Sequence, residues 1–217
     1  MPLHILSETN YFPPVSDAME DGLLAIGGDV QPERLLSAYQ KGIFPWYNED
    51  IPLWWSPDPR FVLFPEELKV SRSMKQLCKH NPFVFTTNQA FQEVLHFCSS
   101  TPRPGQNGTW LNEDLMQSLL HLHTLGWAHS AEVWIENQLV GGLYGIRVGK
   151  LFCGESMFSK INSASKYAFI QYVQQLQKNG VELIDCQVYS NHLASLGARF
   201  IKREIFMQYL PEFSQPL

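Results

Sequence analysis

The sequence predicts an α/β fold with a mixed sheet, preceded by a small N-terminal lobe. From about residue 61 onward, patterns typical of strands and of helices alternate along the chain. A strand, an amphipathic helix and a second strand follow one another between residues 151 and 188, which predicts a right-handed crossover between two parallel strands. The first 60 or so residues are instead rich in turn residues. We therefore expect a small lobe at residues 1–62 and a larger domain at residues 63–217.

The small lobe has one well-defined helix. It runs from about Pro32 to Lys41, with proline in its first turn and Gly42 just past its end. Aromatic residues crowd the rest of the lobe, and core packing is the expected role of Phe44 and Trp54.

The larger domain begins with the apolar run "RFVLF". Helices are predicted in "SRSMKQLCKH", near "NQAFQEVLHFC" and from Asn112 to Leu125, with a strand at "FVFT". Three strand-like runs follow, with turns at Asn137 and Gly149: "AHSAEVW", "QLVGGLYGIRVG" and "KLFCGESMF". The helix "SASKYAFIQYVQQLQKNG" ends at Gly180, and the strand "LIDCQV" comes directly after it.

Composition limits the class of protein. The 217 residues are 45% hydrophobic and 13% aromatic, and no apolar run approaches the roughly 20 residues of a membrane span. The N-terminus lacks the pattern of a secretory signal, and four scattered cysteines read as reduced core residues. We expect a cytoplasmic protein. The net charge of −5 is a weak argument against nucleic acid, but residues 1–60 hold nine acidic and three basic side chains, so the rest is close to neutral.

Polar residues interrupt both strands of the crossover. Strand alternation places Asp185 and Gln187 on one face of "LIDCQV", and Glu155 on the same face as Cys153 and Met157 in "LFCGESMF". A structural polar pair at a strand end is the alternative explanation. Ligands of α/β sheets collect beyond the carboxyl ends of parallel strands, where these side chains would converge, so we expect a functional site there.

Two further features suggest contact with a nucleic acid. Arg72, Lys75 and Lys79 share one face of a predicted helix that Ser71 caps, although an ordinary solvated face explains them as well. Trp46 and Trp110 lie beside turn residues and are candidates for stacking on a ligand.

Several common sites are missing from the sequence. His121, His123 and His129 lack the spacing and the partners of a metal site, so none is expected. Neither G-x-x-x-x-G-K nor G-x-G-x-x-G occurs, and "GESMF" departs from the G-x-S-x-G serine elbow.

The order of motifs resembles that of the bacterial leucyl/phenylalanyl-tRNA-protein transferases, from about residue 12 to about residue 203. The motifs are "GLLAIGGD", "KGIFPWY", "LWWSPDPRFVL", "SRSMK", "GTW", "HSAEVW", "LVGGLYG", "LFCGESMFS", "SASK" and "LIDCQV". The resemblance implies a larger domain of the GNAT acyltransferase type. It also implies a reaction that creates an N-degron, a signal for protein degradation. Leu or Phe, and less well Met, would pass from aminoacyl-tRNA to the N-terminal Arg or Lys of a protein. No cofactor is implied, and we expect a monomer.

The resemblance also implies roles for single residues. Asp185 and Gln187 would form the reacting centre, where the carboxylate hydrogen-bonds and polarises the amide, whose oxygen helps deprotonate the attacking α-amine. Glu155 would attract the cationic side chain of the acceptor. The basic helix would meet the acceptor stem. The adenosine and aminoacyl pocket would comprise Tyr39, Trp46, Trp110, Leu143, Phe152, Tyr172 and Ile184, with the two tryptophans holding the terminal adenosine.

The pocket departs from the family pattern at three positions. Leu143 and Tyr172 stand where relatives carry Met and Phe, and Leu119 replaces a Tyr near the adenosine site. These changes leave the preference among Leu, Phe and Met open.

Two other functions remain to be separated from this one. An acetyl-CoA-dependent N-acetyltransferase would have a similar fold, but "SKINSAS" lacks the glycines that cradle a pyrophosphate. A non-catalytic binder of N-terminal residues or tRNA ends would need the aromatic residues and Glu155, but not Asp185 with Gln187.

Overall fold

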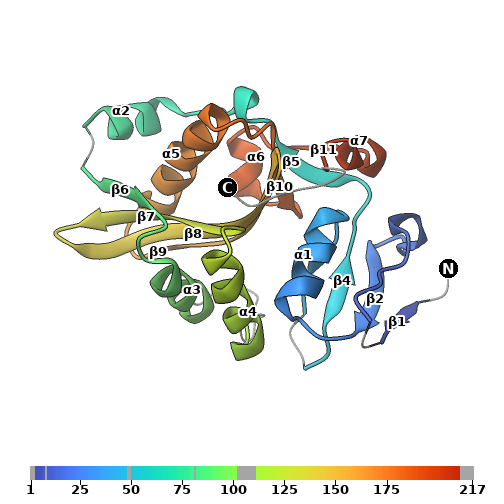
Figure 1. The fold of residues 1–217 in the computed structure, drawn as a ribbon. Coiled ribbons are helices and arrows are strands. Elements are labelled where there is room, and N and C mark those ends of the chain that lie inside the picture. The colour runs from blue at the N-terminus through green and yellow to red at the C-terminus, as the bar shows by residue number, and fades with distance from the viewer. Residues whose placement is uncertain (1–2, 8, 48–49, 81, 102–110, 211–217) are drawn as a thin grey trace.

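The computed structural model describes residues 3–7, 9–47, 50–80, 82–101 and 111–210 (Figure 1). The small lobe is built on a sheet with, in the described part of the chain, the strand order β1–β2–β4–β3. Pro32 opens α1 and Gly42, with a φ of 73°, follows its end, which confirms the predicted helix. The bounds of these elements are His4–Leu6 (β1), Leu23–Gly27 (β2), Pro32–Gln40 (α1), Phe44–Pro45 (β3) and Leu53–Trp55 (β4), with a 3₁₀ turn at Val15–Asp17.

The larger sheet is mixed, as predicted. Among the described residues its order is β11–β5–β10–β9–β8–β7–β6, in which β9 and β10 are parallel and the other neighbours antiparallel. Asn137 and Gly149, both with positive φ, turn the chain between β7, β8 and β9. The strands are Arg60–Leu63 (β5), Val84–Thr87 (β6), Ala128–Ile135 (β7), Gln138–Val148 (β8), Leu151–Ser159 (β9), Leu183–Gln187 (β10) and Arg199–Ile201 (β11).

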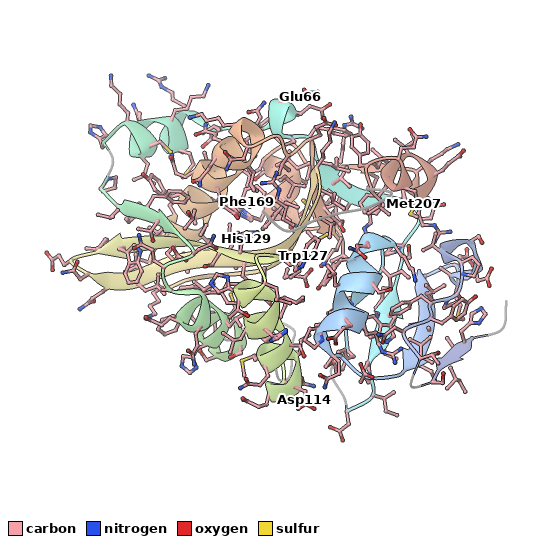
Figure 2. The ribbon with its side chains drawn as sticks, viewed as in Figure 1. Glu66, Asp114, Trp127, His129, Phe169 and Met207 are labelled. Atoms are coloured by element: carbon pink, nitrogen blue, oxygen red, sulfur yellow. The ribbon has the colours of Figure 1, made fainter. Side chains whose placement is uncertain are left out.

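Helices cover both faces of the larger sheet. In Figure 1, α5 lies on one face and α3 with α4 on the other. Figure 2 shows Phe169 projecting from α5 and Trp127 on the side of α4. The helices are Arg72–His80 (α2), Phe91–Ser100 (α3), Glu113–Thr124 (α4), Ala164–Lys178 (α5), Asn191–Ser195 (α6) and Arg203–Met207 (α7), with a 3₁₀ turn at Pro65–Glu67.

The hydrophobic core has two parts, one on each face of the larger sheet. The part under α5 is closed by residues of that helix and by β5 and β10. The other part joins α3 and α4 to α1 and the small sheet, so the small lobe shares a core with the larger domain. Phe44 and Trp54 lie in this shared core, with 2% and 0% of their surfaces exposed, which confirms their expected packing role.

Two other expectations are met by the fold. All four cysteines lie in the described part of the chain, and three of them, Cys98, Cys153 and Cys186, are buried as core residues. His123 is structural, because its ring stacks on Phe91 at 4.2 Å and its Nδ1 donates to the carbonyl of Ala128. The described residues contain neither a cluster of His, Cys, Asp and Glu side chains suited to a metal nor a helix long and apolar enough to cross a membrane.

Candidate functional site

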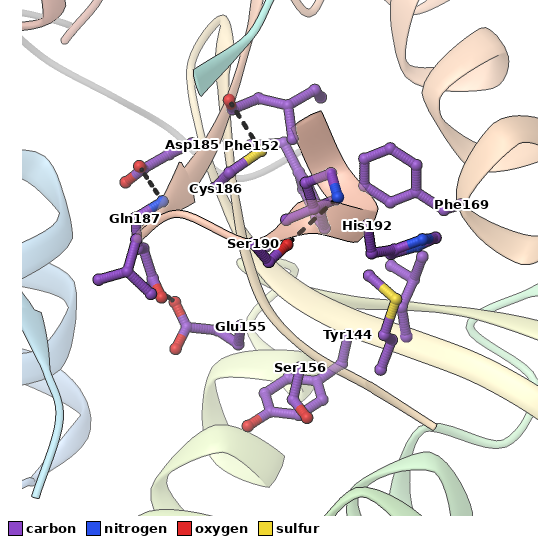
Figure 3. A pocket seen from close by; sticks show the side chains of 16 residues that line it. Tyr144, Phe152, Glu155, Ser156, Phe169, Asp185, Cys186, Gln187, Ser190 and His192 are labelled. Carbon is purple, nitrogen blue, oxygen red and sulfur yellow. Dashed lines mark hydrogen bonds between the residues drawn. The ribbon is translucent and has the colours of Figure 1, made fainter. Parts of the chain in front are cut away.

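A cavity of about 310 Å³ opens where the parallel strands β9 and β10 part (Figure 3). Their pairing reaches Cys153 opposite Asp185, and each strand then bulges. Glu155 is the extra residue in β9 relative to β8, and Cys186 is the extra residue in β10 relative to β5. Bulges interrupt the ladder of hydrogen bonds and redirect side chains, so they place Glu155 and Gln187 at the opening between the strands.

The bulge in β9 depends on a glycine across the ladder. A Cβ on Gly145 would come within 2.1 Å of the Cys153 carbonyl oxygen and 2.5 Å of the Phe152 ring. Only glycine therefore allows β8 to pass so close to β9 at this point. The bulge also corrects the prediction that Met157 and Cys153 share one face of the strand. Met157 packs in the part of the core under α5 and Cys153 in the other part, because the extra residue reverses the alternation.

The cavity has an apolar body and polar ends. Figure 3 shows Glu155 and Gln187 at one end and His192 beside Phe169 at the other. Burial lowers the pKa of His192, and Lys166 adds to the effect, so its ring is neutral at pH 7. The apolar wall comprises Leu143, Phe152, Met157, Phe169, Ile184 and Leu193.

The Asp185 carboxylate accepts three hydrogen bonds. Arg60 donates to it through Nε at 2.8 Å and Nη2 at 2.6 Å, and the backbone N–H of Gln187 donates at 2.9 Å. Both side chains of the ion pair are 1% exposed. The Arg60 guanidinium also lies between the rings of Phe44 and Phe206, 4.6 and 4.7 Å from their centroids. This arrangement holds Asp185 in one position.

The side-chain amide of Gln187 pairs with Glu155, not with Asp185. Its Nε2 donates to Glu155 Oε1 at 2.6 Å (Figure 3), and its backbone has a φ of 63°. This overturns the expectation that the Asp185 carboxylate hydrogen-bonds the amide side chain, since Asp185 reaches only the backbone of Gln187. The bulge at Cys186 separates the two side chains that regular alternation would bring together.

The environment of Glu155 favours its neutral form. Burial raises the pKa of Glu155 to about 8, and the nearby Asp185 carboxylate adds to the rise, while hydrogen bonds from Tyr39 and Gln187 and the charge of Arg60 oppose it. Burial likewise raises the pKa of Tyr39, whose hydroxyl is directed at Glu155.

Comparison with known proteins identifies the family. A sequence model of the family described as leucyl/phenylalanyl-tRNA protein transferase matches residues 62–211. A second family model, for the N-terminal domain of that transferase, matches residues 28–58. The chain belongs to this family. It is an aminoacyltransferase, an enzyme that transfers leucine or phenylalanine from aminoacyl-tRNA to protein N-termini in the N-degron pathway.

Curated relatives support the family over most or all of their own length. The transferase of Christiangramia forsetii is 53% identical over 96% of this chain and 100% of its own length, and that of Flavobacterium johnsoniae is 53% identical over 96% and 99%. The transferase of Yersinia enterocolitica is 52% identical over 95% of this chain and 87% of its own. Solved structures with a similar chain path include a GCN5-related N-acetyltransferase from Kribbella flavida, with a TM-score of 0.40, 9% identity, and coverage of 76% of this chain and 59% of that one.

Of the residues expected in the substrate pocket, some line the cavity and others lie behind its wall or in the core. Leu143, Phe152 and Ile184 line the cavity. Tyr172 lies behind Phe152, with the two rings edge to face at 5.2 Å, and is not part of the cavity wall. Leu119 is buried in the core on α4.

The described residues among the expected adenosine and tRNA contacts lie outside the cavity wall. Tyr39 is buried, with 2% of its surface exposed, and reaches Glu155. Trp46 follows β3 with 37% exposed, its ring 5.8 Å from that of Trp55, whereas Trp110 lies outside the described residues. The three basic side chains expected to contact the acceptor stem are all exposed on α2: Arg72, Lys75 and Lys79.

Sequence reasoning missed Arg60 and His192. The signal for Arg60 was a lone cation at the start of the apolar run "RFVLF", and His192 stands five residues after Gln187. Neither signal indicates a partner by itself, because the partner of Arg60 is 125 residues away along the chain.

Proposed function

We propose that the cavity between β9 and β10 holds the side chain of the transferred amino acid, and that Arg or Lys at the acceptor N-terminus enters at the Glu155–Gln187 end. The observation that carries this proposal is the apolar cavity with polar groups at its mouth. Its volume of about 310 Å³ is near the lower limit of ligand sites, roughly 300 to 1,000 Å³, so it suits one amino-acid side chain. The adenosine of the tRNA then lies outside it.

The contacts of the pocket support an apolar donor. Leu, Phe and, less well, Met fit a wall without charges, and discrimination among them is graded because one methylene is worth only about 1 to 3 kcal/mol. Trp46, which lies outside the pocket, and Trp110 hold the terminal adenosine by stacking, and the exposed cations of α2 contact the acceptor stem.

The reacting centre needs no cofactor, because the ester of aminoacyl-tRNA is already activated. Gln187 positions the acceptor, and Asp185 acts as a positioning residue that fixes the backbone of Gln187 through its N–H. The enzyme works as a cytoplasmic monomer in this proposal. Residues 1–62 contribute the small lobe and 63–217 the catalytic domain.

A transfer assay tests the proposed function. The protein is incubated with Leu-tRNA or Phe-tRNA and with peptides that begin with Arg, Lys or Ala, and mass spectrometry follows the addition of one residue. We expect extension of the Arg and Lys peptides only, and a loss of roughly 10²-fold or more in Gln187→Ala with tRNA binding retained. Acetylation from acetyl-CoA, or binding of the charged tRNA without transfer, would contradict the proposal.

A further inference from the structure

Two carboxyl groups line the cavity, and only one of them is available for chemistry. Asp185 is 0% exposed and accepts two hydrogen bonds from Arg60 and one from the Gln187 backbone. These bonds hold both of its oxygens against Arg60 and the Gln187 backbone, in a fixed position away from solvent. Asp185 is therefore a positioning residue, and its oxygens are not directed at a substrate in the cavity.

Glu155 differs from Asp185 in its partners. Within the described residues, no basic side chain forms an ion pair with it, and its hydrogen bonds come from the neutral donors Tyr39 and Gln187. Its carboxyl lies at the mouth of the cavity, where the proposed function places the acceptor α-amine.

Gln187 is a poor candidate for the base itself. An uncharged amide has almost no affinity for a proton, and this amide already donates through Nε2 to Glu155 at 2.6 Å. The pairing lets it orient the carboxyl and leaves its own oxygen to accept a hydrogen bond.

We propose that Glu155 is the general base of the transfer reaction. This inference rests on the proposed function. The α-amine nitrogen attacks the ester carbonyl carbon, an N–C bond forms, and Glu155 takes the proton from nitrogen. The bond between the carbonyl carbon and the ribose oxygen then breaks, and the same proton passes from Glu155 to that oxygen. The products are the extended peptide, a tRNA with a free hydroxyl and the regenerated carboxylate.

The electrostatics of the site agree with this role. Burial raises the pKa of Glu155 to about 8, close to the roughly 7.7 to 8.0 of an α-amino group, and a base works best when its pKa is near the working pH. The titratable and charged groups around it come from four elements: Tyr39 (α1), Arg60 (β5), Cys153 (β9) and Asp185 (β10).

This role replaces the expected contact of Glu155 with the acceptor's side-chain cation. A carboxyl that is largely protonated at pH 7 attracts a cation only weakly, and two neutral donors already bind it. The two roles differ in kinetics, because a base acts on kcat and a cation-binding group acts mainly on KM.

The first experiment measures kcat and KM for an Arg-peptide at saturating Phe-tRNA in Glu155→Gln. The matched control is Glu182→Gln, which removes an exposed carboxylate of the segment leading into β10. We expect kcat to fall by roughly 10² to 10⁴-fold in Glu155→Gln with KM little changed, and the control to match the wild type. A raised KM with normal kcat, or full activity, would overturn the inference while the transfer activity of the wild type still supports the proposed function.

The second experiment separates the enzyme's base from the substrate's own amine, which titrates in the same range. Tyr39→Phe removes a hydrogen bond that lowers the pKa of Glu155, so the rise of single-turnover rate with pH should move to higher pH. The acceptor amine is the same in both measurements and cannot cause a shift. An unmoved inflection would show that Glu155 is not the base, and this result decides the matter even if Glu155→Gln does not fold. Absence of transfer in the wild type at every pH would instead contradict the proposed function.

Discussion

Arg60 connects more of the site than any other single side chain described above. Its guanidinium binds Asp185 of β10 and stacks between Phe44 of β3 and Phe206 of α7. A planar cation suits this position because it hydrogen-bonds in its plane and packs against rings on both faces. The small lobe, the last helix and the reacting centre therefore meet at one residue.

Removal of Arg60 should destabilise the protein strongly. Arg60→Met leaves the buried Asp185 carboxylate without its cation, which typically costs about 3 to 5 kcal/mol. The double variant Arg60→Met/Asp185→Asn should recover part of this loss, because it removes the unpaired charge. The measurement is the free energy of unfolding in urea for Arg60→Met, for Asp185→Asn and for the double variant. Equal values for Arg60→Met and the double variant would show that the charge of Asp185 is not what makes the loss large.

The pocket wall predicts which residues set the choice between Leu and Phe. Leu143 lines the cavity, so Leu143→Ala enlarges it and should lower Leu transfer more than Phe transfer. Tyr172 lies behind Phe152, and Tyr172→Phe should leave the product ratio close to that of the wild type. Competition between Leu-tRNA and Phe-tRNA for one Arg-peptide measures this ratio. A larger change in Tyr172→Phe than in Leu143→Ala would mean that the amino acid binds elsewhere.

At the scale of elements, the site is made by irregularities in two strands. The extra residue Glu155 reverses the alternation of β9 at its carboxyl end, and the bulge at Cys186 does the same in β10. The two strands pair regularly only as far as Asp185. Polar side chains at the ends of the strands thus face an opening and not a neighbouring strand.

Helix α2 is amphipathic and exposes its cations. Met74 is its buried residue and Ser71 accepts a hydrogen bond from the Met74 N–H at the start of the helix. If Lys75 neutralises one phosphate, the slope of log affinity against log salt concentration should become less negative by about 0.7 to 0.9 in Lys75→Ala. Filter binding of Leu-tRNA and Phe-tRNA should show the same change for both, since phosphate contacts do not read identity.

A second lysine provides the control for α2. Lys178 is exposed in the last turn of α5, so Lys178→Ala changes net charge equally on a different element. We expect the wild-type slope in this variant. Equal slopes for Lys75→Ala and the wild type would identify α2 as a solvated face.

At the scale of the molecule, the small sheet and the larger sheet do not have separate cores. One hydrophobic cluster contains Leu24 of β2, Leu35 of α1 and Leu115 of α4. Figure 1 shows α1 facing the end of the larger sheet, and the ion pair of Arg60 crosses the same region. Neither lobe can bury its apolar surface without the other.

The shared core predicts one cooperative unfolding transition. In a variant with Trp110, Trp127 and Trp134 replaced by Phe, the remaining Trp46, Trp54 and Trp55 report on the small sheet by fluorescence, whereas far-UV circular dichroism reports mainly on helices of the larger domain. Urea titrations followed by the two probes should coincide. Two separated midpoints would show that the small lobe unfolds by itself.

The sequence by itself determined the order of elements and the class of the fold. Local signals sufficed for α1, whose proline and glycine mark its ends, and for the parallel pair β9 and β10, which a helix connects. Glu155, Asp185 and Gln187 were recognisable because polar residues interrupt apolar strands. Such signals depend on residues that are neighbours in sequence, so they can be read without knowing the fold.

Only the tertiary structure decided which groups meet. The pairing of Asp185 with Arg60 joins residues 125 positions apart, and the pairing of the Gln187 amide with Glu155 depends on two bulges that alternation does not predict. Tyr172 was expected in the pocket but lies behind Phe152. A one-residue bulge reverses the face of every later side chain in a strand, so the partners of a polar group follow from three-dimensional packing and not from spacing along the chain.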